Sequence, residues 1–345
     1  MAIDRVFTQP GPDEENYLTS LRPRRLDECI GQQSVRQQLQ IAIEAAAARG
    51  EPLDHVLLDG PPGLGKTTLA HVIAHEMNAT IRVTSGPAIT RQGDLMMMLT
   101  QMERGDILFI DEVHRLNTVV EEFLYPAMED FRVDYTTDSG IGGRTVNFAL
   151  KQFTLIGATT RAGMLSQAMR TRFGLVFHME YYSTEELTEI VKRNAKLLKI
   201  EARPGALERL ASRARGTPRI VNRLLRRVRD YAQVRGDGVL SPEVVDATME
   251  ILQVDELGLD SLDRAYLNAL IKHYDGGPAG IEAIAAAMGH ERDTLEDVVE
   301  PYLLQLGFVI RTPRGRAARP AAYEHLGLAR PKTNEDNTDQ DILFK

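Results

Sequence analysis

Cysteine is nearly absent from the chain. Cys29 is the single cysteine among 345 residues, so no internal disulfide bond can form. This scarcity is typical of proteins in a reducing cytosol, where structural disulfides are rare. A buried, inert thiol is therefore the expected state of Cys29.

Long apolar runs are absent as well. No stretch of 18 or more apolar residues occurs, which excludes a helix that crosses a membrane. The first residues, MAIDRVFTQPGPDEENYL, lack the basic segment followed by an apolar segment that marks a secretory signal. Together these absences predict a cytoplasmic protein.

The chain shows no internal repeat, and its length indicates two or three globular domains. Short apolar runs alternate with helical patterns over its first half. Strands are expected within residues 55–60, 79–86, 106–114, 152–161 and 177–183, and helices within 67–77 and 94–102. This alternation predicts an α/β fold, a parallel sheet with helices on both faces.

Strand patterns stop after residue 183. Residues 183–254 read as a small helical domain, and residues 255–328 as three helices followed by a short basic hairpin, the pattern of a winged helix. The predicted division is therefore a flexible arm over 1–20, a large α/β domain over 21–182, these two domains, and a disordered tail over 329–345.

Acidic residues are scarce in two stretches, although the net charge of the chain is −8. From Arg203 to Arg235 ten arginines stand against two acids, and from Arg311 to Arg319 four arginines stand with none. The total charge argues weakly against a nucleic-acid partner, but the distribution matters more, and the acid-free cluster 311–319 favours binding to backbone phosphates. Binding of that kind is independent of base sequence and sensitive to salt.

Residues 60–67, GPPGLGKT, fit the phosphate-loop pattern GxxxxGK[ST] between an expected strand and an expected helix. The glycines let backbone N–H groups point at phosphate oxygens. Lys66 adds a positive charge, Thr67 a hydroxyl for Mg²⁺, and the helix N-terminus a favourable dipole. The sequence therefore predicts a nucleotide site.

Polar residues that end two further strands complete such a site. In ILFIDEVH, Asp111 can hold the water shell of Mg²⁺ and Glu112 can orient or deprotonate the attacking water. Glutamate directly after aspartate favours hydrolysis over nucleotide storage. In TLIGATT, either Thr159 or Thr160 can hydrogen-bond the γ-phosphate or the water, although a plain strand terminus is an equally good interpretation from spacing alone.

Residues 131–150 predict a β-hairpin inserted into the α/β domain, because apolar residues alternate on both sides of a glycine-rich tip. Ile141 lies among the glycines of that tip. An exposed apolar side chain at such a place suggests contact with a partner.

These motifs resemble those of AAA+ ATPases, and longer stretches resemble the RuvB family of bacterial Holliday-junction branch-migration motors. The resemblance covers roughly residues 15–328, in order. It is carried by LRPRRLDECIGQ, LLDGPPGLGKTTLAHVIA, ILFIDEVHRL, FTLIGATTRAGMLSQAMRTRFG, GTPRIVNRLLRRVRDYA and GHERDTLEDVVEPYLLQLGFVIRTPRGRAA.

The resemblance implies an ATP-driven motor that translocates duplex DNA during homologous recombination and DNA repair. It implies ATP or ADP with Mg²⁺ as ligands, and a hexameric ring as the working form. It also implies a junction-binding partner of the RuvA type, docked on the hairpin 131–150 and tentatively on Ile141, and a resolvase of the RuvC type.

The resemblance also assigns site residues. Those that would bind nucleotide are Leu21, Arg22, Gly63, Lys66, Thr67, Thr68, Glu129, Asp130, Phe131, Tyr182 and Arg219. Those that would act in hydrolysis are Lys66, Asp111, Glu112, Thr160 as the first sensor and Arg219 as the second sensor in the helical lid. Thr67 and Asp111 would hold Mg²⁺. Arg292, Arg311 and Arg316 would contact DNA.

Two arginines in SQAMRTRFG, residues 166–174, raise the question of oligomeric state. An arginine at the rim of the domain can reach the ATP of a neighbouring subunit and stabilise charge on its γ-phosphate. The resemblance picks Arg172 for this role in trans, although sequence alone leaves an exchange with Arg170 open.

Simpler interpretations compete at several positions. Tyr182 fits an ordinary core aromatic, and most arginines fit a solvated surface. The expected helix 293–306 is acidic and carries Pro301, which is poor equipment for reading bases and favours backbone tracking. The alternatives for the whole chain are a clamp loader or initiator of the AAA+ class, or a nucleotide-gated DNA-binding scaffold.

Overall fold

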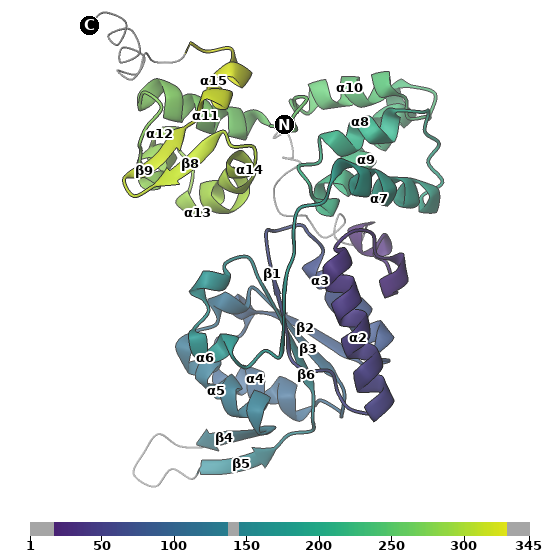
Figure 1. Cartoon of the computed structure of the whole chain (residues 1–345), viewed down its shortest axis with the longest axis vertical. Helices are drawn as coiled ribbons and strands as arrows, with labels where there is room; N and C mark the ends of the chain where they lie inside the picture. Colours follow the sequence, from purple (N-terminus) through teal and green to yellow (C-terminus); the bar gives the residue numbers. More distant parts are fainter. Residues whose placement is uncertain (1–16, 137–144, 330–345) are drawn as a thin grey trace, which may run out of the picture. The chain divides into compact units, whose positions relative to one another are not determined.

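The structure is a computed structural model that describes residues 17–136 and 145–329 (Figure 1). Most of the expected arm 1–20, nearly all of the expected tail 329–345, and Ile141 lie outside the described residues. The described chain forms two compact units, one of residues 17–200 and 216–222, the other of residues 201–215 and 223–329. Each unit is described below by itself.

The first unit is built on the parallel sheet that the apolar runs predict. Five strands lie in the order β2-β3-β6-β1-β7, and each neighbouring pair is parallel. Their bounds are β1 Val56–Asp59, β2 Ile81–Ser85, β3 Ile107–Asp111, β6 Thr154–Thr159 and β7 Leu175–His178. The three central strands are buried on both faces, as their unbroken apolar runs require.

Helices cover both faces of this sheet (Figure 1). Because side chains alternate along a strand, Ile107 and Phe109 of β3 enter one core and Leu108 and Ile110 the other. The first core contains residues of α2 Gln33–Arg49 and α3 Lys66–Glu76. The second contains residues of α4 Gln92–Thr100, α5 Thr118–Glu129 and α6 Gln167–Arg170.

A two-stranded antiparallel hairpin follows α5. It consists of β4 Arg132–Thr136 and β5 Thr145–Ala149, with Val133 paired to Phe148. Figure 1 shows it projecting beyond the sheet. Val133 is buried against the second core, whereas Val146 and Phe148 are 38% and 37% exposed, so β5 offers apolar surface to solvent.

The helical segment after β7 contributes to both units. It contains α7 Thr184–Leu197, α8 Ala206–Ser212, α9 Pro218–Arg235 and α10 Pro242–Ile251. Helix α7 belongs to the first unit, together with residues 216–222 at the start of α9. Helices α8 and α10 and the rest of α9 belong to the second unit.

The rest of the second unit is a winged helix with its own core. Its helices are α11 Ser261–His273, α12 Ile281–Met288, α13 Arg292–Thr294, α14 Glu300–Gln305 and α15 Pro320–Leu326. Strands β8 Val309–Thr312 and β9 Gly315–Ala318 pair antiparallel as the basic wing.

The helix expected over 293–306 is present, but it is not α-helical throughout. A π-helical segment, η5 Leu295–Val299, separates α13 from α14. Pro301 lacks the backbone N–H that an uninterrupted α-helix needs at this position, which accounts for the irregular turn ahead of it.

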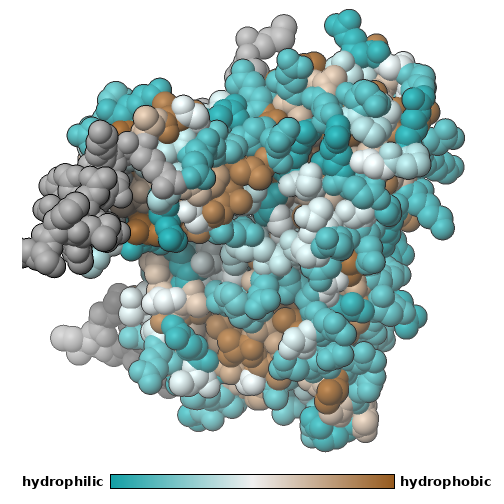
Figure 2. All heavy atoms as spheres, turned by 45° about the horizontal axis from the view of Figure 1, so that its top comes forward, coloured by the Kyte–Doolittle hydropathy of each residue, from teal (hydrophilic) through white to brown (hydrophobic). Residues whose placement is uncertain are grey.

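Within residues 17–136 and 145–329, no helix has the length and apolar character needed to span a membrane. Figure 2 shows a face that is mainly hydrophilic, with apolar residues in small separate groups.

Candidate active site

The phosphate loop lies at the carboxyl edge of the parallel sheet. Strand β1 ends at Asp59, the loop follows from Gly60, and α3 begins at Lys66. Its neighbour β6 carries Thr159 opposite Asp59, and β3 on the far side of β6 ends at Asp111. The sheet thus brings the loop, the threonines and the acidic pair to one edge, where ligands of open α/β sheets bind.

Two glycines give the loop its shape. Gly60 has φ 141°, and a Cβ there would lie 2.5 Å from the carbonyl oxygen of Met179. Gly63 has φ 83°, and a Cβ there would lie 3.2 Å from the Cβ of Arg219. Side chains at these positions would be strained, so the path of the loop ahead of α3 requires glycine at both.

Lys66 is a buried cation aimed back at its own loop. Its Nζ donates hydrogen bonds to the carbonyl oxygens of Gly60 (2.6 Å) and Pro61 (2.8 Å). The pKa of Lys66 is lowered to about 8, mainly by burial and to a smaller extent by the charge of Arg219, whereas the charges of Asp111 and Asp59 oppose the shift. A buried ammonium group held only by neutral oxygens is suited to binding an anion.

The acidic pair occupies an unusual backbone. Glu112 has φ 50°, a left-handed conformation rare outside glycine, and its N–H donates to Asp111 Oδ1 at 2.9 Å. The Glu112 carboxylate forms an ion pair with Arg115, Nη1 to Oε2 at 2.9 Å. Backbone strain of this kind gathers at functional sites, and here it turns Glu112 out of the strand.

The two threonines lie in different surroundings. The hydroxyl of Thr159 lies 2.9 Å from His114 Nδ1 and accepts from the N–H of Arg161 at 3.0 Å. Thr159 is buried, and its hydroxyl is engaged in joining β6 to the turn after Glu112. Thr160 follows the last residue of the strand and is half-buried at the same edge.

Sequence reasoning missed Gly86, which lies in the turn η2 Gly86–Ala88 after β2. A Cβ at Gly86 would lie 2.4 Å from the carbonyl oxygen of Glu112 and 3.2 Å from the N of Leu116. Only a residue without a side chain permits this close approach, which fixes the backbone around Glu112. The sequence gives no signal for it, since the contact is between distant segments.

The N-terminal segment and the hinge meet around Tyr182. The Tyr182 hydroxyl donates to the carbonyl oxygen of Leu64 in the phosphate loop at 3.3 Å. The backbone N–H of Tyr182 donates to the carbonyl oxygen of Gly216 at 2.9 Å. Gly31 packs so closely that a Cβ there would lie 2.6 Å from the tyrosine ring. Burial raises the pKa of Tyr182, so the hydroxyl stays neutral. Tyr182 therefore ties the loop to the start of the lid.

Arg193 of α7 was missed at the sequence level and anchors the N-terminal segment. Its guanidinium donates to the carbonyl oxygen of Leu21 at 3.0 Å and forms an ion pair with Glu28 at 3.3 Å. Leu21 is buried, and Arg22 is near enough to His71 for its charge to lower the pKa of that imidazole, after the larger effect of burial.

Arg219 lies against the phosphate loop of its own subunit. Its backbone N–H donates to the carbonyl oxygen of Gly63 at 3.3 Å, and its charge contributes to the lowered pKa of Lys66. Residues 216–222 belong to the same compact unit as the loop, so this contact lies within one unit.

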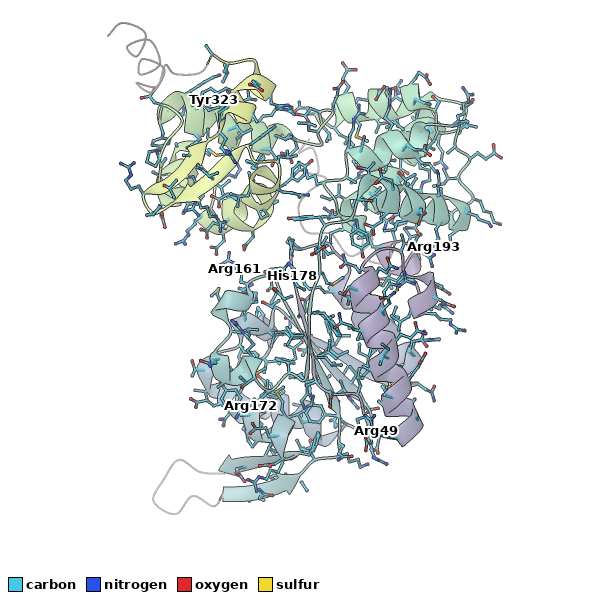
Figure 3. The ribbon with its side chains drawn as sticks, viewed as in Figure 1. Arg49, Arg161, Arg172, His178, Arg193 and Tyr323 are labelled. Carbon is cyan, nitrogen blue, oxygen red and sulfur yellow. The ribbon has the colours of Figure 1, made fainter. Side chains whose placement is uncertain are left out.

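Arg172 lies at the opposite edge of the sheet. It precedes β7, whose first residue, Leu175, pairs with Val56, the first residue of the parallel strand β1. The phosphate loop follows the other end of β1. Figure 3 shows Arg172 beside α5, whereas Arg161 and His178, which follow or end strands at the carboxyl edge, lie at the far end of the sheet.

The stretch Glu129–Phe131 accompanies Arg172. Glu129 pairs with Arg172, Nη2 to Oε2 at 3.1 Å, and Asp130 pairs with Arg132 at 3.0 Å. Phe131 has φ 50°, and its ring packs edge-on to Phe153 at 5.9 Å between centroids. The predicted nucleotide residues thus fall into two groups, one at each edge of the sheet.

The wing arginines converge on a buried carboxylate. Glu300 is 0% exposed and accepts hydrogen bonds from Tyr266 (2.8 Å), Arg311 (2.6 Å) and Arg316 (2.7 Å). Arg316 also bonds Glu296 at 2.7 Å, and its side chain is largely covered, whereas that of Arg311 is 52% exposed. Glu300 therefore sets the geometry of the wing.

Arg292 begins α13 and is engaged by acids on its own face. It pairs with Glu282 at 2.9 Å and with Glu296 at 3.2 Å, and these carboxylates raise its pKa. Its side chain remains 54% exposed, so its guanidinium stays accessible.

A strand, a glycine loop with a buried lysine, a helix, an acidic pair at a second strand and a lid arginine at the loop define a P-loop ATPase of the AAA+ class. A winged helix with a basic wing adds the fold of a DNA-binding module. Three family models cover this architecture. The model of the Holliday junction DNA helicase RuvB P-loop domain matches residues 21–179. The model of the RuvB AAA lid domain matches residues 182–255, and that of the RuvB C-terminal winged helix domain matches residues 256–327.

Solved structures agree with these matches. The Thermotoga maritima RuvB Holliday junction branch migration motor is 52% identical, with a TM-score of 0.82 over 90% of this chain and 99% of that chain. A point variant of Thermotoga maritima RuvB is 51% identical, with a TM-score of 0.84 over 90% of this chain and 100% of that chain. The chain belongs to the RuvB family of Holliday-junction branch-migration ATPases. This membership decides against a clamp loader, an initiator or a passive scaffold.

ATP binding is expected to weaken as the pH rises through the pKa of Lys66. The anionic nucleotide favours the ammonium form, and that form is lost from the free protein above about pH 8. The apparent Kd for ATP should rise about tenfold between about pH 7 and pH 9. Titration with a fluorescent ATP analogue measures it. Lys66→Arg, which stays charged, should show a flat profile, and equal profiles for both proteins would contradict the assignment.

Proposed function

We propose that this chain works as a hexameric ring. Each ATP is bound by one subunit, and Arg172 of the next subunit completes the active site for hydrolysis. The observation that carries the proposal is the position of Arg172. It lies at the amino edge of the sheet, whereas its own phosphate loop lies at the carboxyl edge. An arginine so placed serves a neighbouring subunit better than its own.

Within one subunit, the loop backbone and Lys66 bind the β- and γ-phosphates. Thr68, in the first turn of α3, also belongs to the nucleotide-binding residues. Glu112 orients the attacking water and takes its proton, and Thr160 bonds the γ-phosphate. The occupied hydroxyl of Thr159 supports the choice of Thr160 for this role. Leu21, Arg22 and Tyr182 border the base, as the contacts of Leu21 and Tyr182 with the lid and the loop suggest.

The donor set fits Mg²⁺. Thr67 in the first turn of α3 and Asp111 at the end of β3 would hold the ion, which would neutralise charge on the phosphates when bound with ATP. Within the described residues, no group of three or more His, Cys, Asp or Glu side chains could hold a metal. That fits an ion that takes most of its ligands from nucleotide and water.

Arg219 acts as the lid sensor. Its N–H bonds the loop at Gly63, and the lid begins just after Tyr182, so loss of the γ-phosphate changes what holds residues 216–222 against the loop. A two-state hinge of this kind converts a difference in phosphate binding into movement of the lid.

The winged helix grips duplex DNA through Arg292, Arg311 and Arg316, whose contacts with phosphates are independent of base sequence. The exposed guanidinium of Arg311 supports direct contact. The cover around Arg316 and its bonds to Glu296 and Glu300 support a second task for it, in shaping the wing.

A junction-binding partner of the RuvA type docks on the hairpin 131–150. The exposed Val146 and Phe148 on β5 support an apolar contact. A resolvase of the RuvC type completes the assembly. The cytoplasmic location stays a prediction from composition.

The test is ATP-dependent dissociation of a synthetic four-way DNA junction, with and without RuvA. The wild-type chain should separate the junction arms with ATP and RuvA, and fail with an ATP analogue that resists hydrolysis. Lys66→Ala should fail with either nucleotide. Dissociation that persists in Lys66→Ala would overturn the motor, and dissociation unaffected by RuvA would overturn the partner.

A further inference from the structure

The guanidinium of Arg172 is held from several sides within its own subunit. Its Cζ lies 4.1 Å from the ring centroid of Tyr125, its Nη2 bonds Glu129 at 3.1 Å, and its Nη1 donates to the carbonyl oxygen of Ala168 at 2.6 Å. The side chain is only 18% exposed. A long side chain is thus fixed in one orientation at the rim of the domain.

Tyr125 is itself fixed to the segment that carries Arg172. Its hydroxyl donates to Glu121 at 2.7 Å and lies 3.1 Å from the hydroxyl of Ser166. Ser166 also donates to Glu121, and it accepts from the N–H of Met169 at 3.0 Å as the N-cap of α6. One network therefore joins α5 to the short helix that ends just before Arg172.

This arrangement restrains the plane of the guanidinium but leaves some of its N–H donors available. An arginine has five N–H donors, and the bonds to Ala168 and Glu129 use two of them. Its Nε is buried and has no hydrogen-bond partner among the described residues. The aromatic face attracts the cation and sets its plane, which reduces the rotamer freedom that binding a phosphate would otherwise remove.

We propose that Tyr125 is the positioning residue of the arginine finger, and that its ring holds Arg172 in the orientation that meets the ATP of the neighbouring subunit. The proposal rests on the trans-acting role proposed above for Arg172. In this role Tyr125 acts through the arginine alone.

Steady-state ATP hydrolysis by Tyr125→Leu tests the proposal first. Loss of the ring should lower kcat about tenfold with little change in KM, since the ATP-binding loop is untouched. Tyr125→Phe keeps the aromatic face and should stay within about threefold of wild type. Tyr231→Leu, which removes a half-buried tyrosine from α9, is the matched control and should leave kcat unchanged. Thermal melting shows whether each variant is folded, and Tyr125→Gln replaces the leucine variant if that one is unstable.

Mixed rings separate positioning from a structural effect. Lys66→Ala subunits lack a working ATP site but keep Tyr125 and Arg172, so mixing them with Tyr125→Leu subunits should restore hydrolysis at the shared interfaces. Arg172→Ala mixed with Lys66→Ala is the reference. If hydrolysis recovers in the reference mixture but not in the mixture with Tyr125→Leu, the positioning role of Tyr125 is overturned and the trans-acting finger stands. No recovery in the reference would overturn the trans-acting finger, and the positioning role with it.

Discussion

Arg172→Ala is expected to lower kcat for ATP hydrolysis about 10³- to 10⁵-fold, the loss seen when an arginine that stabilises a phosphoryl transition state is removed. ATP binding should change by less than about threefold, because the phosphate loop and Lys66 of the same subunit keep their contacts. Steady-state hydrolysis and titration with a fluorescent nucleotide measure the two effects separately.

The physical reason is the distance between the arginine and its own loop. Strand β1 separates them, and four residues of strand span about 13 Å. The side chain is also held toward α5 by Tyr125 and Glu129, away from the carboxyl edge. A defect of kcat without a defect of binding is the pattern of a group that acts only in the transition state.

Arg170→Ala is the matched control. Arg170 is exposed at the end of α6, and its guanidinium donates to the carbonyl oxygen of Ala162 at 2.6 Å. Its loss should change kcat less than about threefold. A large defect in Arg170→Ala together with near-normal activity in Arg172→Ala would exchange the two roles, and full activity in both variants would remove the finger altogether.

The parts of this site that sequence predicts are the local ones. The phosphate loop and the acidic pair are fixed by short motifs next to apolar strands, because the chemistry requires those residues within a few positions of one another. The parallel sheet and the winged helix follow from the same apolar patterns. Strand order and the edge on which each segment falls then place Lys66, Thr160 and Asp111 together.

The contacts that orient the site are invisible in the sequence because they join distant segments. Tyr125 reads as one more aromatic of an amphipathic helix, and nothing marks it as the partner of Arg172. Glu300 reads as an acid in an already acidic helix, although it is wholly buried among wing arginines. Gly86 acquires meaning only when the backbone of Glu112 lies against it.

Arg215→Ala is expected to destabilise the second unit by about 3–5 kcal/mol, the cost of leaving one partner of a buried ion pair alone. Arg215 is 4% exposed, and Asp263 in α11 is 1% exposed. The guanidinium pairs closely with Asp263 and donates to the carbonyl oxygen of Gly258 at 2.7 Å. Chemical denaturation followed by far-ultraviolet circular dichroism measures the loss.

The loss should exceed that of an exposed pair several-fold. Arg203 and Asp237 are each 58% exposed and 2.9 Å apart, so Arg203→Ala should cost no more than about 1 kcal/mol. Asp263 also accepts from the N–H of Asp260 at 2.8 Å, within the capping box of α11. Asp263→Asn preserves that acceptor while removing the charge, so Arg215→Met with Asp263→Asn should recover part of the stability that Arg215→Ala loses.

Arg215→Ala should also weaken the coupling of ATP hydrolysis to the movement of DNA. Arg215 immediately precedes Gly216 and lies four positions before Arg219, while its partner Asp263 begins the winged helix. The ion pair thus fastens the winged helix to the chain segment that leads to Arg219, the lid sensor proposed above. ATP hydrolysis without DNA should stay within a few-fold of wild type, because Lys66 and Glu112 are untouched, whereas junction dissociation per ATP hydrolysed should fall. Equal loss of both activities would indicate a fold defect, and unchanged dissociation would show that the pair contributes stability alone.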